Sequence, residues 1–176
     1  ALELSNLKRA IDSGKPFAEE LATIRSEAAD KTALAALEPF KDKGVASFQS
    51  LEQEFRDVIP AVLDGAPAAD QGDGSFLGHL TGFARSAMKI RKIDHAPDDK
   101  SAEAVLGRME TALKERHLDS VLTLAKDLPA EAAAGAKAWL AEVSARFAAD
   151  QAIVALETEL KSSLAAGGSG DGKTTN

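Results

Sequence analysis

The sequence of 176 residues contains no cysteine and no tyrosine, and aromatic residues make up only 5% of it. Without cysteine, disulfides and thiolate metal sites are excluded. The scarcity of aromatic residues disfavours a β-sheet, whereas the abundance of Ala and Leu favours helices. We therefore predict an all-α fold of short antiparallel helices, a basic amphipathic helix and a terminal helical bundle with one long C-terminal helix.

Two targeting features are also missing. No apolar run approaches the roughly 20 residues that a membrane-spanning helix needs, and no signal peptide opens the chain. Because the first residues already follow a helical pattern, we expect the chain to be a piece of a longer protein. Any membrane anchor would then lie upstream of it.

Patterns of catalytic and metal-binding residues are lacking as well. The three histidines, His79, His95 and His117, lie in separate segments without other ligands at metal-binding spacing. No serine occupies a nucleophile elbow, and the Gly-Asp-Gly at 72–74 lacks the ending of a phosphate-binding loop. We expect no enzymatic activity, no catalytic residue, no cofactor and no metal.

The stretch 76–92, FLGHLTGFARSAMKIRK, differs in charge from the rest of the chain. It holds four basic residues and no acidic one, which leaves 17 Lys and Arg against 28 Asp and Glu elsewhere. At about 100° per residue, the large apolar side chains share one side of a helix and most basic ones lie opposite, as in a helix that lies in a membrane interface. The predicted lipid-binding residues are Phe76, Leu77, Leu80, Phe83, Arg85, Met88, Lys89, Ile90, Arg91 and Lys92.

Two other interpretations of this stretch remain open. Most amphipathic helices of soluble proteins pack into their own core, which would make the chain a soluble helical adaptor that docks protein partners. Gly78 and Gly82 argue against this, because each costs about 1 kcal/mol relative to Ala inside a helix. The segment is therefore a poor helix in water and would gain from an environment that orders it. Nucleic acid could contact the basic groups and stack on Phe76 and Phe83. A net charge of −7 argues against it, since the chain would repel a polyanion.

Periodicity and turn residues predict further helices on both sides of this stretch. Before it, helices are expected over 2–13, from Pro16, over 32–43 and from an N-cap at Ser47. Pro39 should shorten the third of these and Pro60 should bend the fourth. After it, a helix pair over 102–128, capped by Asp98 or Ser101, precedes the longest helix, from 130 to about 164. Its expected buried residues are Trp139, Leu140, Val143, Phe147, Val154, Leu156 and Leu160.

The long helix outreaches the pair beside it, so its far apolar residues need another cover. Either a second copy of the chain covers Ile153, Leu156 and Leu160, or the N-terminal helices do so within one chain. We predict a homodimer and keep the second arrangement as the alternative. The predicted organisation is an N-terminal helical array (1–64), a linker (65–75), the basic segment (76–93), a helical domain (94–164) and a disordered tail (165–176).

The order of features from Phe76 to about Leu160 resembles the C-terminal part of the mitofilin family. The resemblance rests on the basic segment ending in MKIRK, on AVLGRMETALKERHLDSVLTLAKDLP, and on KAWLAEVSARFAADQAIVALETEL. Its most specific positions are the pairs Trp139-Leu140, Arg146-Phe147 and Gln151-Ala152. We take the chain for a bacterial member of this family.

The resemblance implies a function in membrane organisation. It implies a MICOS-like scaffold of the inner membrane, anchored upstream of this chain, with this part facing the periplasm or the intermembrane space. Such a scaffold binds anionic lipid, self-associates, shapes cristae or intracytoplasmic membranes and bridges to outer-membrane protein partners. Lipid binding carries over to 76–92, and partner docking and self-association carry over to 102–160 as a region.

Overall fold

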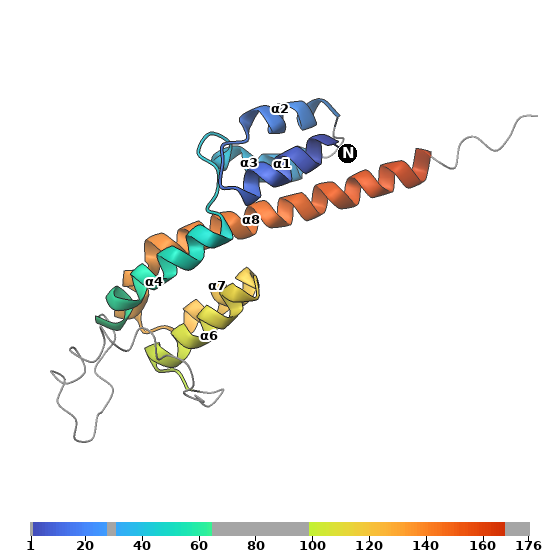
Figure 1. The fold of residues 1–176 in the computed structure, drawn as a ribbon. Coiled ribbons are helices and arrows are strands. Elements are labelled where there is room, and N and C mark those ends of the chain that lie inside the picture. Colours follow the sequence, from blue (N-terminus) through green and yellow to red (C-terminus); the bar gives the residue numbers. More distant parts are fainter. Residues whose placement is uncertain (1, 28–30, 65–98, 168–176) are drawn as a thin grey trace, which may run out of the picture. The chain divides into compact units, whose positions relative to one another are not determined.

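The computed structural model describes residues 2–27, 31–64 and 99–167 (Figure 1). These residues form seven α-helices, two 3-10 helices and no strand, which confirms the predicted all-α class. The helices are α1 (Leu2–Asp12), α2 (Ala18–Glu27), α3 (Lys31–Leu37), η1 (Glu38–Phe40), α4 (Phe48–Asp64), α6 (Ala102–Lys114), α7 (Leu118–Leu124), η2 (Ala125–Asp127) and α8 (Ala130–Gly167).

The chain divides into two compact units that do not follow its order. Unit 1 combines residues 1–51 with 141–176, and unit 2 contains 52–140. The boundary falls inside α4 and α8, so each of these helices contributes residues to both units. The linker predicted at 65–75 lies outside the described residues, so its boundaries stay predictions. Of the disordered tail predicted at 165–176, residues 165–167 instead form the end of α8, and residues 168–176 lie outside the described residues.

Several helix ends form where the sequence predicts them. The Ser47 hydroxyl accepts the Ser50 N–H at 3.1 Å and caps α4, and Ser101 caps α6 in the same way. Pro39 lies in η1, directly after α3, and thereby ends that α-helix early. Gly14, at φ +68°, ends α1, and Lys15 N–H donates to the Ala10 carbonyl at 3.0 Å.

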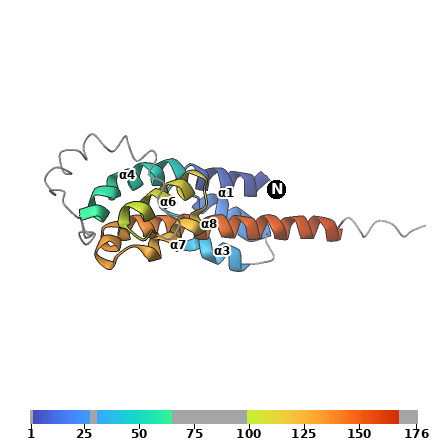
Figure 2. The ribbon, with the colours of Figure 1, turned by 90° about the horizontal axis from the view of Figure 1, so that it is seen from below.

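Unit 1 is built on the pairing of α1 with the C-terminal part of α8, which lie side by side in both ribbon views (Figures 1 and 2). Lys8 contacts Glu157 and Asp12 contacts Arg146, so the two helices run antiparallel. A shared apolar core holds α1, α2 and α3 on α8. It includes Leu7, Ile11, Phe17, Leu21, Ile24, Leu34, Leu37, Val45, Ala149, Ala152, Ile153 and Leu156.

This core covers two of the three far apolar residues of α8, and Leu160, the third, is half-buried. Ile153 and Leu156 are only 5% and 4% exposed, because the N-terminal helices of the same chain cover them. Their burial therefore no longer argues for a second copy. Val154, expected to be buried, is 57% exposed, and that prediction was wrong. On a helix, Val154 points about 100° away from Ile153, and the core takes the face of Ile153.

Unit 2 packs α6 and α7 as the predicted antiparallel pair with parts of α4 and α8. Arg116, at φ +62°, turns the chain between the pair. Trp139 of α8 is 2% exposed, and its ring centroid lies 4.9 Å from that of Phe55 on α4. The buried residues of this unit include Phe55, Val62, Val105, Met109, Leu113, Leu118, Val121, Leu128, Ala132, Ala136 and Trp139.

Candidate functional site

All ten predicted lipid-binding residues, from Phe76 to Lys92, lie outside the described residues, so their role stays a prediction. The structure does describe both flanks of that stretch. The chain is described up to Asp64 at the end of α4 and again from Asp99, just before α6. Both flanks belong to unit 2. Residues 65–98, which contain the predicted lipid-binding stretch, therefore connect two described segments of the same unit.

The flank before α6 is fixed by side-chain hydrogen bonds. The Asp99 carbonyl accepts a hydrogen bond from Arg108 Nη2 at 2.7 Å, and its carboxylate accepts the Ser101 N–H at 2.8 Å. Ser101 Oγ in turn accepts the Ala104 N–H at 3.3 Å. Because these bonds join the flank to the first two turns of α6, the position of Asp99 is set by a formed helix.

The flank at the end of α4 is fixed by a close crossing with α8. A Cβ built on Gly135 would lie 2.7 Å from the Ala61 carbonyl oxygen and 3.0 Å from the Val62 backbone nitrogen. No side chain fits in that space, so glycine is needed for the two backbones to approach. Ala61 is three residues before the end of α4 at Asp64. The crossing therefore holds the last turn of this helix.

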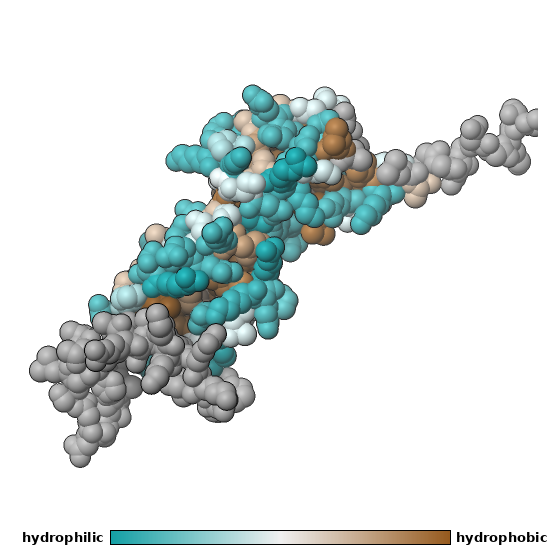
Figure 3. Space-filling view, in the orientation of Figure 1, coloured by the Kyte–Doolittle hydropathy of each residue, from teal (hydrophilic) through white to brown (hydrophobic). Residues whose placement is uncertain are grey.

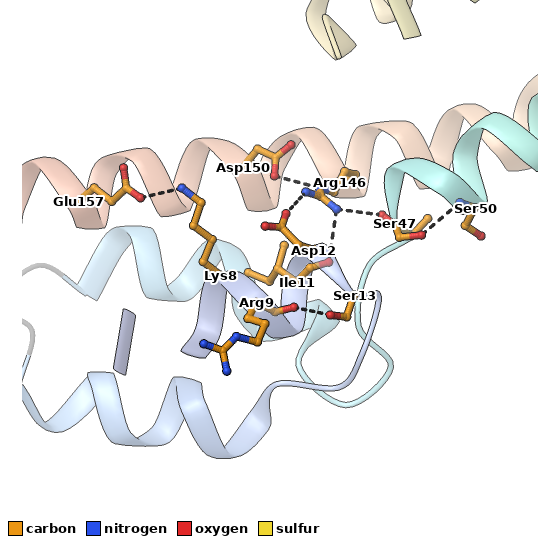
Figure 4. Close-up of polar contacts among 11 residues, drawn as sticks. Lys8, Arg9, Ile11, Asp12, Ser13, Ser47, Ser50, Arg146, Asp150 and Glu157 are labelled. Carbon is orange, nitrogen blue, oxygen red and sulfur yellow. Dashed lines mark hydrogen bonds and ion pairs between the residues drawn. The ribbon is translucent and has the colours of Figure 1, made fainter. Parts of the chain in front are cut away.

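Unit 1 contains an arginine that is almost wholly buried. Arg146 of α8 is 2% exposed (Figure 4). Its Nη2 donates to Asp12 Oδ1 at 2.5 Å, and its Nε donates to Asp150 Oδ1 at 2.9 Å. Burial raises the pKa of the Asp150 carboxyl above its ordinary value, and the positive charge of Arg146 opposes that rise. The carboxylates of Asp12 and Asp150 thus compensate the positive charge of the buried guanidinium.

The same guanidinium also contacts the backbone of two other segments. Arg146 Nη1 donates to the Ile11 carbonyl at 3.3 Å and to the Ala46 carbonyl at 3.4 Å. The Phe48 ring covers its face, with 4.6 Å between the guanidinium carbon and the ring centroid. Arg146 thus meets the end of α1, the segment before α4 and the first turn of α4.

Reasoning from periodicity did not assign a role to Arg146. One signal could have done so, because the residue follows Trp139 and Val143 and precedes Ile153 at helical spacing. A long cation within such an apolar stripe indicates a buried residue with polar partners. Which partners it meets depends on segments more than a hundred residues away.

Metal-binding clusters and membrane-spanning helices are absent from the part of the chain that the structure describes. No group of three or more His, Asp or Glu side chains there could hold a metal ion. None of the described helices combines the length and apolarity that crossing a membrane requires. Among these residues, Leu2 and Val154 are the large apolar side chains that are most exposed, at 69% and 57%. The face seen in Figure 3 is largely hydrophilic.

Comparison with known proteins identifies the family. The family model of mitofilin, described as a mitochondrial inner membrane protein, matches residues 2–161. The chain belongs to the mitofilin family. The match includes α1 to α4, so these helices are part of the mitofilin-type region, which the resemblance from Phe76 onward did not cover.

Curated relatives of this mitofilin-family chain are named as MICOS complex subunits. The chain is 29% identical over 154 residues to "MICOS complex subunit mic60" of Talaromyces marneffei, covering 85% of the chain and 24% of the relative. It is 31% identical over 152 residues to MICOS complex subunit MIC60 of Pyrenophora tritici-repentis, covering 84% and 23%. None of these relatives is bacterial, so the expectation of a bacterial member is not supported. The chain spans about a quarter of their length, and no solved structure gives a significant match.

Proposed function

We propose that this chain is part of a non-enzymatic inner-membrane scaffold and that it binds anionic lipid through residues 76–92. The observation that carries the proposal is the mitofilin match over residues 2–161, a family described as a mitochondrial inner membrane protein. Relatives named as MICOS complex subunits support assembly with protein partners. We propose that these include partners in the outer membrane, as the resemblance to the family implies. In this proposal an anchor outside this chain holds it at the inner membrane, facing the intermembrane space or the periplasm, where it helps to organise cristae or intracytoplasmic membranes.

The energetics of lipid binding favour an anionic surface. Four cations near such a surface contribute about 1 kcal/mol each before salt screening. Each large apolar side chain of the segment adds at most about 1.5–3 kcal/mol if it is fully buried. Ordering of the helix opposes both contributions. Since both flanks belong to one compact unit, a bound segment would bring unit 2 to the membrane surface.

Vesicle co-sedimentation tests the lipid-binding proposal. The chain is expected to pellet with anionic vesicles and to stay in solution with neutral ones. Phe83→Glu should abolish most of this binding and leave the Tm unchanged, because it places a charge on the apolar side of the segment. Val154→Glu is the matched control, since it makes a comparable change at a side chain that is 57% exposed on α8. It should keep vesicle binding.

Two results would contradict the proposal. Equal absence from both vesicle pellets would exclude lipid binding by this chain. A large fall in Tm for Phe83→Glu would indicate that Phe83 is buried in the protein, because a buried charge without a partner costs several kcal/mol. The second result would favour the soluble adaptor, which docks protein partners without binding a membrane.

We further propose that the chain forms a homodimer at the membrane. Two basic segments on one assembly bind a surface with avidity, and they can impose a curvature that a single segment cannot. Light scattering across a concentration series, with and without anionic lipid, should show the mass of two chains at high concentration or on lipid addition. A constant monomer mass under both conditions would exclude the dimer.

A further inference from the structure

We propose that Arg146 is a conformational clamp. Its guanidinium, on α8, binds both the end of α1 and the segment just before α4, so that these three elements become ordered together. The clamp lies wholly within unit 1. It does not depend on residues 76–92 or on membrane binding. Its physical basis is that several elements must supply hydrogen-bond acceptors to one buried cation at the same time.

The acceptors around Arg146 come from three parts of the chain. A guanidinium has five N–H donors in a rigid plane. Here one donor serves Asp150 on its own helix, two serve Asp12 and the Ile11 carbonyl on α1, and one serves the Ala46 carbonyl before α4. Arg146 is 2% exposed, whereas the Asp12 and Asp150 side chains are 52% and 36% exposed. Water therefore reaches the guanidinium only if one of these carboxylates turns away or a neighbouring element moves.

The acceptors therefore depend on one another. If α1 left, Arg146 would keep its charge but lose Asp12 and the Ile11 carbonyl. If the segment before α4 left, the guanidinium would lose the Ala46 carbonyl and the cover of the Phe48 ring. A buried charged donor without an acceptor is unfavourable. The loss of one element from Arg146 should therefore also weaken the binding of the other element to α8.

A second contact, independent of the guanidinium, joins the same two segments. A Cβ on Gly44 would lie 2.7 Å from the Lys15 carbonyl oxygen and 2.8 Å from the Gly14 carbonyl oxygen. The Phe17 N–H donates to the Lys41 carbonyl at 2.8 Å. The turn after α1 and the segment before α4 thus touch through their backbones as well. The clamp therefore acts on two segments that are also in direct backbone contact with each other.

The ion pair of Lys8 with Glu157 provides the contrast. It also joins α1 to α8, with its charged atoms 3.0 Å apart, and its hydrogen bond with Glu157 raises the pKa of Lys8 (Figure 4). Its side chains are 54% and 34% exposed, so water can replace each partner. This pair connects two elements only. Lys8→Met is therefore a matched control for substitutions in the clamp.

Amide hydrogen exchange on the whole chain tests the clamp. Asp12→Asn changes only the α1 side of the site. It should lower the protection of the Lys15 amide, at the end of α1, and of the Leu51 amide, in the first turn of α4, by similar factors of roughly tenfold. Arg146→Lys keeps the positive charge but cannot reach all four acceptors, and it should lower protection at both amides further. Lys8→Met should leave both nearly unchanged.

The Leu51 amide decides the outcome. This amide donates to the Ser47 carbonyl at 2.9 Å in α4, whereas Asp12 accepts from Arg146 at the end of α1, so a purely local role of Asp12 would leave the amide unaffected. Unchanged protection of Leu51 in Asp12→Asn would overturn the clamp, as would equal effects of Lys8→Met and Asp12→Asn. Fluorescence of Trp139, the one tryptophan of the chain, checks in parallel that unit 2 remains folded.

Discussion

Trp139→Ala is expected to lower the free energy of unfolding of unit 2 by about 3–5 kcal/mol. Trp139 is 2% exposed and packs against Phe55, with 4.9 Å between the ring centroids. Truncation removes the largest side chain of α8 from this core and leaves a cavity beside Phe55. Denaturant unfolding followed by circular dichroism measures the loss, because the variant no longer contains a tryptophan.

Two further variants make this result specific. Trp139→Phe should be clearly milder, since an aromatic ring remains against Phe55. Val154→Ala removes an apolar side chain from the same helix at a site that is 57% exposed, and should stay within about 0.5 kcal/mol of the parent chain. If Trp139→Ala destabilised the chain as little as Val154→Ala does, the packing of Trp139 against Phe55 of α4 would be refuted.

Gly135→Ala and Gly107→Ala should change stability in opposite directions. Both glycines lie inside helices, where alanine is intrinsically better by about 1 kcal/mol. A Cβ on Gly107 would meet nothing within 4 Å, so this substitution should raise the free energy of unfolding by about 0.5–1 kcal/mol. At Gly135 the Cβ would lie 2.7 Å from the Ala61 carbonyl, and separating the helices should lower stability by about 1–3 kcal/mol.

The fluorescence of Trp139 follows both variants, because Gly107, Gly135 and Trp139 all belong to unit 2. A gain of stability for both variants would mean that α4 and α8 do not approach closely at Gly135. The crossing matters for the proposed function because it holds the last turn of α4, directly before the chain passes into residues 65–98. Its loosening would free one of the two flanks of the predicted lipid-binding stretch.

The local structure of this chain could be predicted from its sequence. Ser47 and Ser101 cap helices, Pro39 ends α3 early, and Gly14 ends α1, as their residue types predict. Caps and turns depend on hydrogen bonds between residues at most five positions apart, so a short stretch of sequence contains all the information. The same is true of the concentration of basic charge at 76–92, which is a property of composition alone.

Which helices share a core was decided only by the tertiary structure. The periodicity of α8 did not distinguish Ile153, which is 5% exposed, from Val154, which is 57% exposed, because both are apolar and adjacent. Ile153 is buried because α1 to α3 pack on its side of α8. The same packing places residues 1–51 in one unit with residues 141–176. Arg146 meets Asp12 across 134 positions, and Gly135 meets the backbone of Ala61. Such contacts depend on how helix faces fit together in space, which a pattern read along one helix does not contain.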